Sequence, residues 1–164
     1  MLIASAVSAT ALVGVTMFWQ GSAHAERTGG PLSPRVATAI PTLAALSSSA
    51  DVRMELNRLR SEKRLPELVF DDWMLGPTAQ HWAETMAAKG HVFHDPELVG
   101  DYQDGWKTLS ESVAAGGSAD AALQTVLNNH RQAAQLFDVA TTTAGVGLQR
   151  EGDVTYLVVR FVAS

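Results

Sequence analysis

Apolar side chains recur at helical spacing in three stretches of the chain. In the first stretch, Val52, Leu56 and Leu59 occupy positions i, i+4 and i+7, which is one face of an α-helix. The serine pair 48–49 lies just before this face and can cap the helix. The pattern therefore predicts a helix that opens a folded domain near Asp51.

The second stretch carries six apolar side chains at the same spacing: Leu75, Ala79, Trp82, Ala83, Met86 and Ala87. Because proline is tolerated only in the first turn of a helix, Pro77 predicts a break near Gly76 and a main helix over residues 77–89. Gly90 suits the left-handed conformation in which many helices end. Trp82, on the apolar face, is predicted to be a core residue.

A third helix is predicted over Ala119–Phe137, and the pattern then changes to that of β-strands. Val154–Val162 is a nearly continuous run of β-branched and aromatic residues, typical of a central strand covered on both faces. A turn with glycine, Arg150–Asp153, joins it to the loosely alternating segment Ala144–Arg150, and Glu111–Ala115 can add another strand. These elements predict an α+β fold in which three to four helices flank a small antiparallel sheet, an α-β-α sandwich.

The chain begins with an uncharged apolar segment. Met1–Ala25 contains no Lys, Arg, Asp or Glu, and it ends in the small-x-small pattern Ala23-His24-Ala25 that precedes signal peptidase cleavage. The rival interpretation is an uncleaved anchor, because Leu2–Trp19 approaches the ~20 residues that span a bilayer. Residues 26–50 are interrupted by glycine and proline and end in serines, which indicates a flexible linker. The predicted organisation is a signal peptide (1–25), a linker (26–50) and one domain (51–164).

The composition of the chain limits which binding partners and which cellular location are expected. The formal net charge of −5 argues against nucleic acid and against anionic membrane surfaces. The absence of cysteine excludes a disulfide scaffold, a thiol nucleophile and a thiolate metal site. About 140 residues remain after the leader, which is enough for one domain with its own core. We therefore expect a secreted or extracytoplasmic monomer that has no stable membrane insertion once the leader is removed.

Three polar residues are the candidates for a site. His94, Glu111 and His130 each lie next to apolar residues, so the fold could bring their side chains together. Two imidazoles and one carboxylate suit Zn²⁺ and leave a fourth position for water. The spacing differs from the His-Glu-x-x-His helix of the zinc proteases. A minimal zinc site is therefore a hypothesis that depends on how the chain folds.

A series of short motifs runs in order through the predicted domain. The motifs are Leu56-Asn57-x-x-Arg60, Leu65-Pro66-x-Leu68, Ala79-x-x-Trp82-Ala83-x-x-Met86-Ala87, His94, Glu111-x-Val113-Ala114, His130-Arg131 and Gly145-Val146-Gly147. The series, from about Asp51 to Phe161, resembles the CAP superfamily, named for cysteine-rich secretory proteins, antigen five and plant pathogenesis-related proteins. The likeness is to its short bacterial members. It implies an α-β-α sandwich with a cleft in which His94, Glu111 and His130 cluster, and such clusters bind a divalent metal in some relatives.

The chain departs from that family pattern around the expected cleft. Ser112 stands where asparagine is usual, Leu127-Asn128-Asn129 stands where bacterial members have Ser-Pro, and the family's second glutamate has no match near Gln124–Leu127. The site implied by the resemblance is therefore a minimal one.

Two classes of function remain open. The resemblance favours a secreted binding module for an apolar ligand, such as a lipid or sterol, or for a cell-envelope partner. The alternative is a metal-dependent or serine hydrolase that acts on peptides or cell-wall material, in which Ser110 or Ser112 would work with His130. The chain lacks the Gly-x-Ser-x-Gly nucleophile motif, so no catalytic residue is assigned.

Overall fold

A computed structural model describes residues 45–100 and 107–163 of the chain. The predicted signal peptide, and all of the predicted linker up to residue 44, lie outside the described residues. The elements, in chain order, are α1 (Ser49–Glu62), β1 (Val69–Phe70), α2 (Leu75–Lys89), β2 (Thr108–Gly116), α3 (Ala119–Asn128), α4 (His130–Leu136), β3 (Thr141–Glu151) and β4 (Val154–Ala163). Among the described residues, no helix is both long enough and apolar enough to cross a bilayer.

The four strands form one sheet in the order β1-β3-β4-β2. β4 runs antiparallel to β3, to which a hairpin connects it, and also antiparallel to β2 on its other side. The short strand β1 runs parallel to β3, with Val69 opposite Thr143. The predicted antiparallel pairing is therefore found for β2, β3 and β4, and the short strand β1 adds one parallel pairing at the edge.

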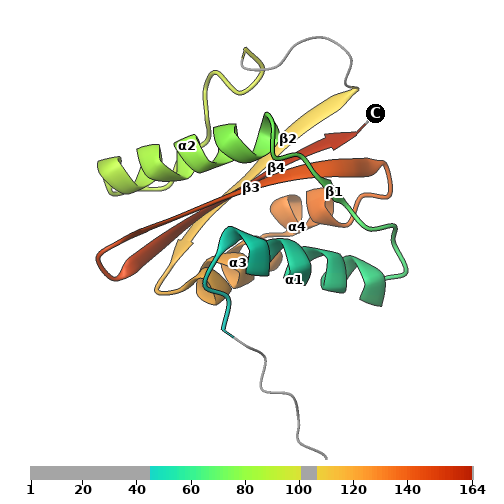
Figure 1. Cartoon of the computed structure of the whole chain (residues 1–164), viewed down its shortest axis with the longest axis horizontal. Helices are drawn as coiled ribbons and strands as arrows, with labels where there is room; N and C mark the ends of the chain where they lie inside the picture. Colours follow the sequence, from blue (N-terminus) through green and yellow to red (C-terminus); the bar gives the residue numbers. More distant parts are fainter. Residues whose placement is uncertain (1–44, 101–106, 164) are drawn as a thin grey trace, which may run out of the picture. The chain divides into compact units, whose positions relative to one another are not determined.

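The prediction of a central strand covered on both faces is confirmed by β4. Nine of its ten residues are buried. Successive side chains of a strand point to opposite faces, so Tyr156 and Val158 pack against α2, whereas Leu157 and Val159 pack in the core shared with α1, α3 and α4. Figure 1 shows α2 on one side of the sheet and the other three helices on the opposite side. This is the predicted α-β-α sandwich.

α1 begins where the sequence indicated. The hydroxyl of Ser48 accepts a hydrogen bond from the Asp51 amide, and Asp51 Oδ2 accepts one in return from the Ser48 amide at 2.9 Å. Near the other end of the helix, Arg60 is completely buried. Its guanidinium donates to the carbonyls of Pro66, Leu136 and Thr141 at 2.6–3.1 Å. Arg60 therefore joins the end of α1 to the connection between α4 and β3.

α2 begins at Leu75, two residues earlier than predicted, so Pro77 lies within the first turn and causes no break. The helix ends at Gly90, whose φ of 70° confirms the predicted left-handed stop. α2 lies directly on β3: a Cβ atom placed on Gly147 would overlap the main-chain carbonyl of Ala79. The two glycines of the Gly145-Val146-Gly147 motif thus allow the helix and the sheet to approach closely.

The predicted helix Ala119–Phe137 is in fact two helices, α3 and α4, separated at Asn129. The Asn129 side chain accepts hydrogen bonds from the amides of Arg131 and Gln132 at 3.1 and 3.4 Å, and so caps α4. This correction changes the position of His130, which becomes the first residue of α4 instead of a mid-helix residue.

Candidate functional site

A buried ion-pair cluster lies at the end of the sheet on the face covered by α2. Glu111 on β2 is opposite Arg160 on β4, and both are almost completely buried. Arg160 Nε lies 3.2 Å from Glu111 Oε2, and Arg160 Nη2 lies 2.5 Å from Asp95 Oδ2. A buried guanidinium is thus held between two carboxylates, which is the condition under which charges are tolerated in a protein interior.

The alternation of side chains along the two strands explains this placement. Glu111 is two residues from Val113 and Arg160 is two residues from Val158, so each shares its neighbour's face of the sheet. Both valines belong to the apolar cluster under α2. The ion pair therefore lies next to the apolar cluster, on the same face of the sheet. Glu111 and Arg160 are directly opposite each other on neighbouring strands and carry opposite charges.

His94 contacts the same carboxylate from the loop that follows α2. Its Nδ1 lies 3.0 Å from Glu111 Oε1, which also accepts a hydrogen bond from the Asp95 amide at 3.1 Å. Because a carboxylate can only accept, this geometry assigns the Nδ1 proton to His94, and in the neutral ring the lone pair is then on Nε2. The His94 side chain is 61% exposed, although its partner is buried.

Trp82 supports the loop that carries His94. Its indole Nε1 donates to the Phe93 carbonyl at 3.0 Å, and the two rings pack edge to face with centroids 4.9 Å apart. Trp82 is partly buried against the apolar cluster under α2, so the core prediction is right in location but overstates the burial. One residue of α2 therefore holds the main chain immediately before His94.

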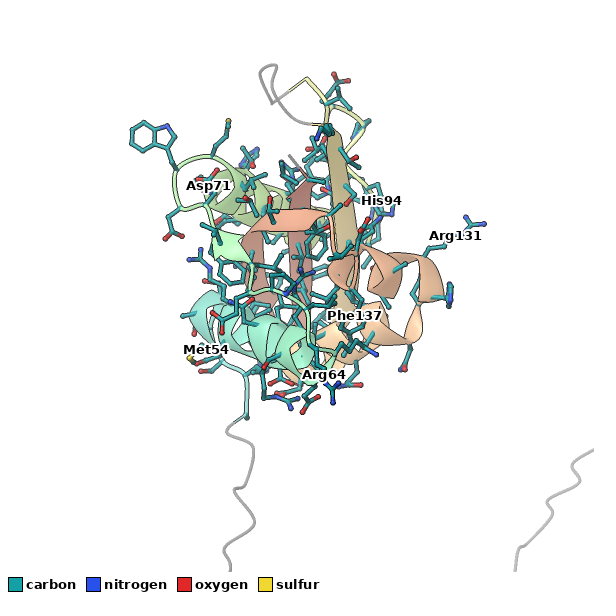
Figure 2. All side chains as sticks on the ribbon, turned by 90° about the vertical axis from the view of Figure 1, so that its right-hand side faces the viewer. Met54, Arg64, Asp71, His94, Arg131 and Phe137 are labelled. Atoms are coloured by element: carbon teal, nitrogen blue, oxygen red, sulfur yellow. The ribbon has the colours of Figure 1, made fainter. Side chains whose placement is uncertain are left out.

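His130 begins α4, the helix that packs on the face of β2 opposite to Glu111. α4 contacts β2 through Ser112, whose hydroxyl donates to Gln135 Oε1 at 2.9 Å, and adjacent residues of a strand point to opposite faces. His130 itself is exposed at the start of α4. Figure 2 shows His94 and the next residue of α4, Arg131, on the same side of the view.

The structure brings together two of the three predicted site residues. His94 and Glu111 are hydrogen-bonded, whereas within residues 45–100 and 107–163 no hydrogen bond or ion pair joins His130 to either of them. In this part of the chain no group of three or more His, Asp or Glu side chains has the arrangement of a metal site. The zinc site therefore stays a prediction.

Arg160 and Asp95 are the members of the cluster that the pattern of the sequence did not reveal. A signal was present for Arg160, because it interrupts an apolar strand predicted to be covered on both faces. A cation in such a position requires a buried acidic partner. Asp95 gave no comparable signal, since an aspartate that follows a helix is ordinarily exposed.

The serines considered as nucleophiles are not paired with histidine. Ser112 is fully buried, and its hydroxyl is bound to Gln135. Ser110 is half-buried, and among the described residues no hydrogen bond joins a serine hydroxyl to a histidine ring. The geometry thus gives the serine-hydrolase alternative no assembled set of residues.

The three-layer α-β-α sandwich is the fold of a known class of secretory proteins. The model of the CAP, or cysteine-rich secretory protein, family matches residues 54–162, and the chain belongs to this family. No curated protein matches the chain at a significant level.

Solved structures share the fold. An outer surface protein of Borrelia burgdorferi is 18% identical with a TM-score of 0.62, and the match covers 73% of this chain and 97% of that protein. An extracellular protein of Bacillus anthracis that contains an SCP domain is 25% identical with a TM-score of 0.60, over 83% of this chain and 45% of that one. A cysteine-rich secretory protein of Staphylococcus aureus is 17% identical with a TM-score of 0.51, over 70% of this chain and 38% of that one. The chain thus spans less than half of the Bacillus and Staphylococcus proteins.

Proposed function

We propose that this CAP domain acts outside the cytoplasm as a binding module, and that His94 is the main ligand of a weak divalent-metal site on it. The observation that carries the proposal is the hydrogen bond from His94 Nδ1 to the buried Glu111 carboxylate. It orients an exposed imidazole with its second nitrogen available to a ligand.

The role of Glu111 in this proposal is to orient His94. Metal-binding histidines typically donate their second ring N–H to a carboxylate or a carbonyl, and this partner fixes the ring and raises its basicity. Both Glu111 oxygens already accept hydrogen bonds, from His94 and the Asp95 amide on one side and from Arg160 on the other. Among the described residues, the cluster contains two carboxylates, Asp95 and Glu111, and one guanidinium, Arg160.

His130 is the proposed second ligand. It lies at the start of α4, which packs on the strand that carries Glu111. A metal held by His94 and His130 would lie at the edge of β2, with water completing its coordination. Imidazole nitrogens suit Zn²⁺ better than Ca²⁺ or Mg²⁺, which prefer oxygen.

The surface favours a cell-envelope partner over an enclosed lipid or sterol. A hollow of about 270 Å³ is lined by three apolar residues, Leu46, Ala119 and Leu148, and by four polar ones, Ser47, Ser118, Arg150 and Thr155. A second hollow, of about 460 Å³, lies along α1 and is lined by Met54 and by polar and charged side chains. Pockets for apolar ligands are lined predominantly by apolar and aromatic side chains, and neither hollow has that lining.

Location outside the cytoplasm is supported by two independent features. The chain starts with an uncharged apolar leader that ends in Ala23-His24-Ala25. Among proteins with this fold, one from Bacillus anthracis is described as extracellular and one from Borrelia burgdorferi as an outer surface protein.

The test is a calorimetric titration of the full chain with Zn²⁺ at about pH 7.5 and about pH 5.5. We expect weak binding at the higher pH, loss of binding in His94→Ala and reduced binding in His130→Ala. Glu111→Gln should weaken binding by about 10–100-fold if Glu111 orients the ligand. Binding should fall at the lower pH, because a protonated imidazole has no lone pair for the metal.

The matched control is His81→Ala, which removes an exposed histidine from α2. It should bind Zn²⁺ as the wild type does. Equal binding by the wild type and His94→Ala would show that any zinc is held elsewhere and would refute the proposed site.

A further inference from the structure

Trp73 is the most exposed large apolar side chain among the described residues, at 92%. It lies in the turn between β1 and α2, where Asp71 and Asp72 precede it. The indole stabilises its own domain very little in this position, since almost none of its surface is removed from water. Tryptophan is one of the residue types that most often contribute a large share of the binding free energy at an interface.

The turn that presents Trp73 is held rigidly. The Asp71 amide donates to the Ala144 carbonyl of β3 at 3.0 Å, which ties the start of the turn to the sheet. The Asp71 carboxylate accepts hydrogen bonds from the amides of Trp73 and Met74 at 2.7 and 3.1 Å. The Asp71 carbonyl accepts another from Gly76 at 2.8 Å. A ligand that binds the indole therefore meets a main chain that is already ordered, which lowers the entropic cost of binding.

A charged residue, Asp72, precedes Trp73 in the turn. Asp72 has a side chain that is 73% exposed, and its Oδ1 lies 2.5 Å from Arg53 Nη1. The pair holds the carboxylate in place while most of it remains accessible to water. The turn thus carries one flat, exposed aromatic side chain and, on the preceding residue, a carboxylate that Arg53 holds in place.

We propose that Trp73 and Asp72 form a binding surface for a neutral polysaccharide. One face of a pyranose ring consists largely of C–H groups and can stack on an indole, while the hydroxyls at its rim donate to neighbouring carboxylates. An anionic lipid surface fits less well, because two aspartates precede Trp73 in the turn and the chain carries a net charge of −5. An anionic glycan is disfavoured for the same reason.

This surface is separate from the His94 site. Figure 2 shows Asp71 and His94 on opposite sides of the view. This inference rests on the proposed function in one respect: the polysaccharide would be the cell-envelope partner proposed above. Its test involves neither His94 nor zinc, so each proposal can fail without the other.

The test is a titration of the full chain with three neutral oligosaccharides, chitotriose, cellotriose and maltotriose, followed by saturation-transfer NMR and calorimetry. We expect saturable binding of at least one of them. Trp73→Ala should weaken this binding by about tenfold or more, as expected for the loss of a dominant aromatic contact. Trp73→Phe should keep much of it, because a flat ring remains.

Val139→Ala is the control, since it shortens an apolar side chain that is 67% exposed elsewhere on the surface. It should bind as the wild type does, and the denaturation midpoint of Trp73→Ala should be unchanged. Absence of saturable binding to all three sugars, or equal binding by Trp73→Ala, would overturn the proposal. Trp73-dependent binding to phosphatidylcholine vesicles or to a protein, with none to sugars, would also overturn it.

Discussion

Arg60 and Arg160 are both completely buried, but their partners differ in kind. Arg60 donates only to main-chain carbonyls, so it satisfies backbone acceptors in the connections after α1 and after α4. Arg160 is bound by two carboxylates and through them reaches the loop of His94. The first arginine therefore fixes the fold, and the second fixes the candidate site as well.

Arg160→Met should destabilise the domain strongly. The substitution leaves Glu111 and Asp95 buried without their cation, and breaking a buried ion pair in this way typically costs about 3–5 kcal/mol. Urea denaturation should show a large decrease in midpoint, and the double variant Arg160→Met/Glu111→Gln should recover part of it. Arg131→Met is the control because Arg131 is exposed on α4. An unchanged midpoint in Arg160→Met would mean that the pair adds nothing to stability.

At the level of single residues, the sequence predicted part of the candidate site. The resemblance to the CAP family placed His94 beside Glu111, and the structure has them hydrogen-bonded. No local pattern could show that Arg160 occupies the other Glu111 oxygen, because this contact depends on the register of β2 against β4. The relation of His130 to the other two residues depends in the same way on how α4 packs.

The elements were predicted best where the periodic pattern was long. The apolar face of α1 and the run of β4 were recognisable because their burial follows the sequence directly. The break between α3 and α4 was missed because the apolar stripe continues across Asn129, whose side chain caps the second helix. The parallel pairing of β1 could not be predicted, since a strand of two residues carries no periodicity of its own.

Gly147→Ala should disturb the contact between α2 and β3. The added methyl would meet the main-chain carbonyl of Ala79, and main chain within a helix cannot move away alone. Overpacking of this kind typically costs about 1–3 kcal/mol. A shift in the urea midpoint would measure it.

Gly117→Ala provides the comparison for that measurement. An added Cβ there meets nothing nearer than the Asp153 carbonyl at 4.0 Å, so its midpoint should stay close to the wild-type value. If both alanine variants unfolded alike, close packing of α2 on β3 would not be the reason that glycine is needed at position 147.

At the scale of the whole domain, the described residues reach their fold without cysteine, the residue that gives the family its name. The sequence contains no cysteine, so no disulfide joins the layers of the sandwich. The described residues are held instead by an apolar core on each face of the sheet and by hydrogen bonds from buried arginines. Its stability should therefore not depend on the redox state of its surroundings.

We expect residues 1–25 to be removed as a signal peptide. The expectation follows from the uncharged apolar run and the Ala23-His24-Ala25 pattern that ends it. N-terminal sequencing of protein recovered from the culture medium should begin at Glu26. Full-length chain confined to the membrane fraction would instead support an uncleaved anchor.

The central position of β4 has a consequence for the order of events during synthesis. β4 comes last among the described elements, yet both β3 and β2 pair with it, and both apolar cores include its side chains. β2 and β3 cannot be joined in one sheet until this segment has been made, because β4 lies between them. We therefore expect the domain to complete its fold only after its last described strand has been made, a timing compatible with passage of the unfolded chain through a narrow channel.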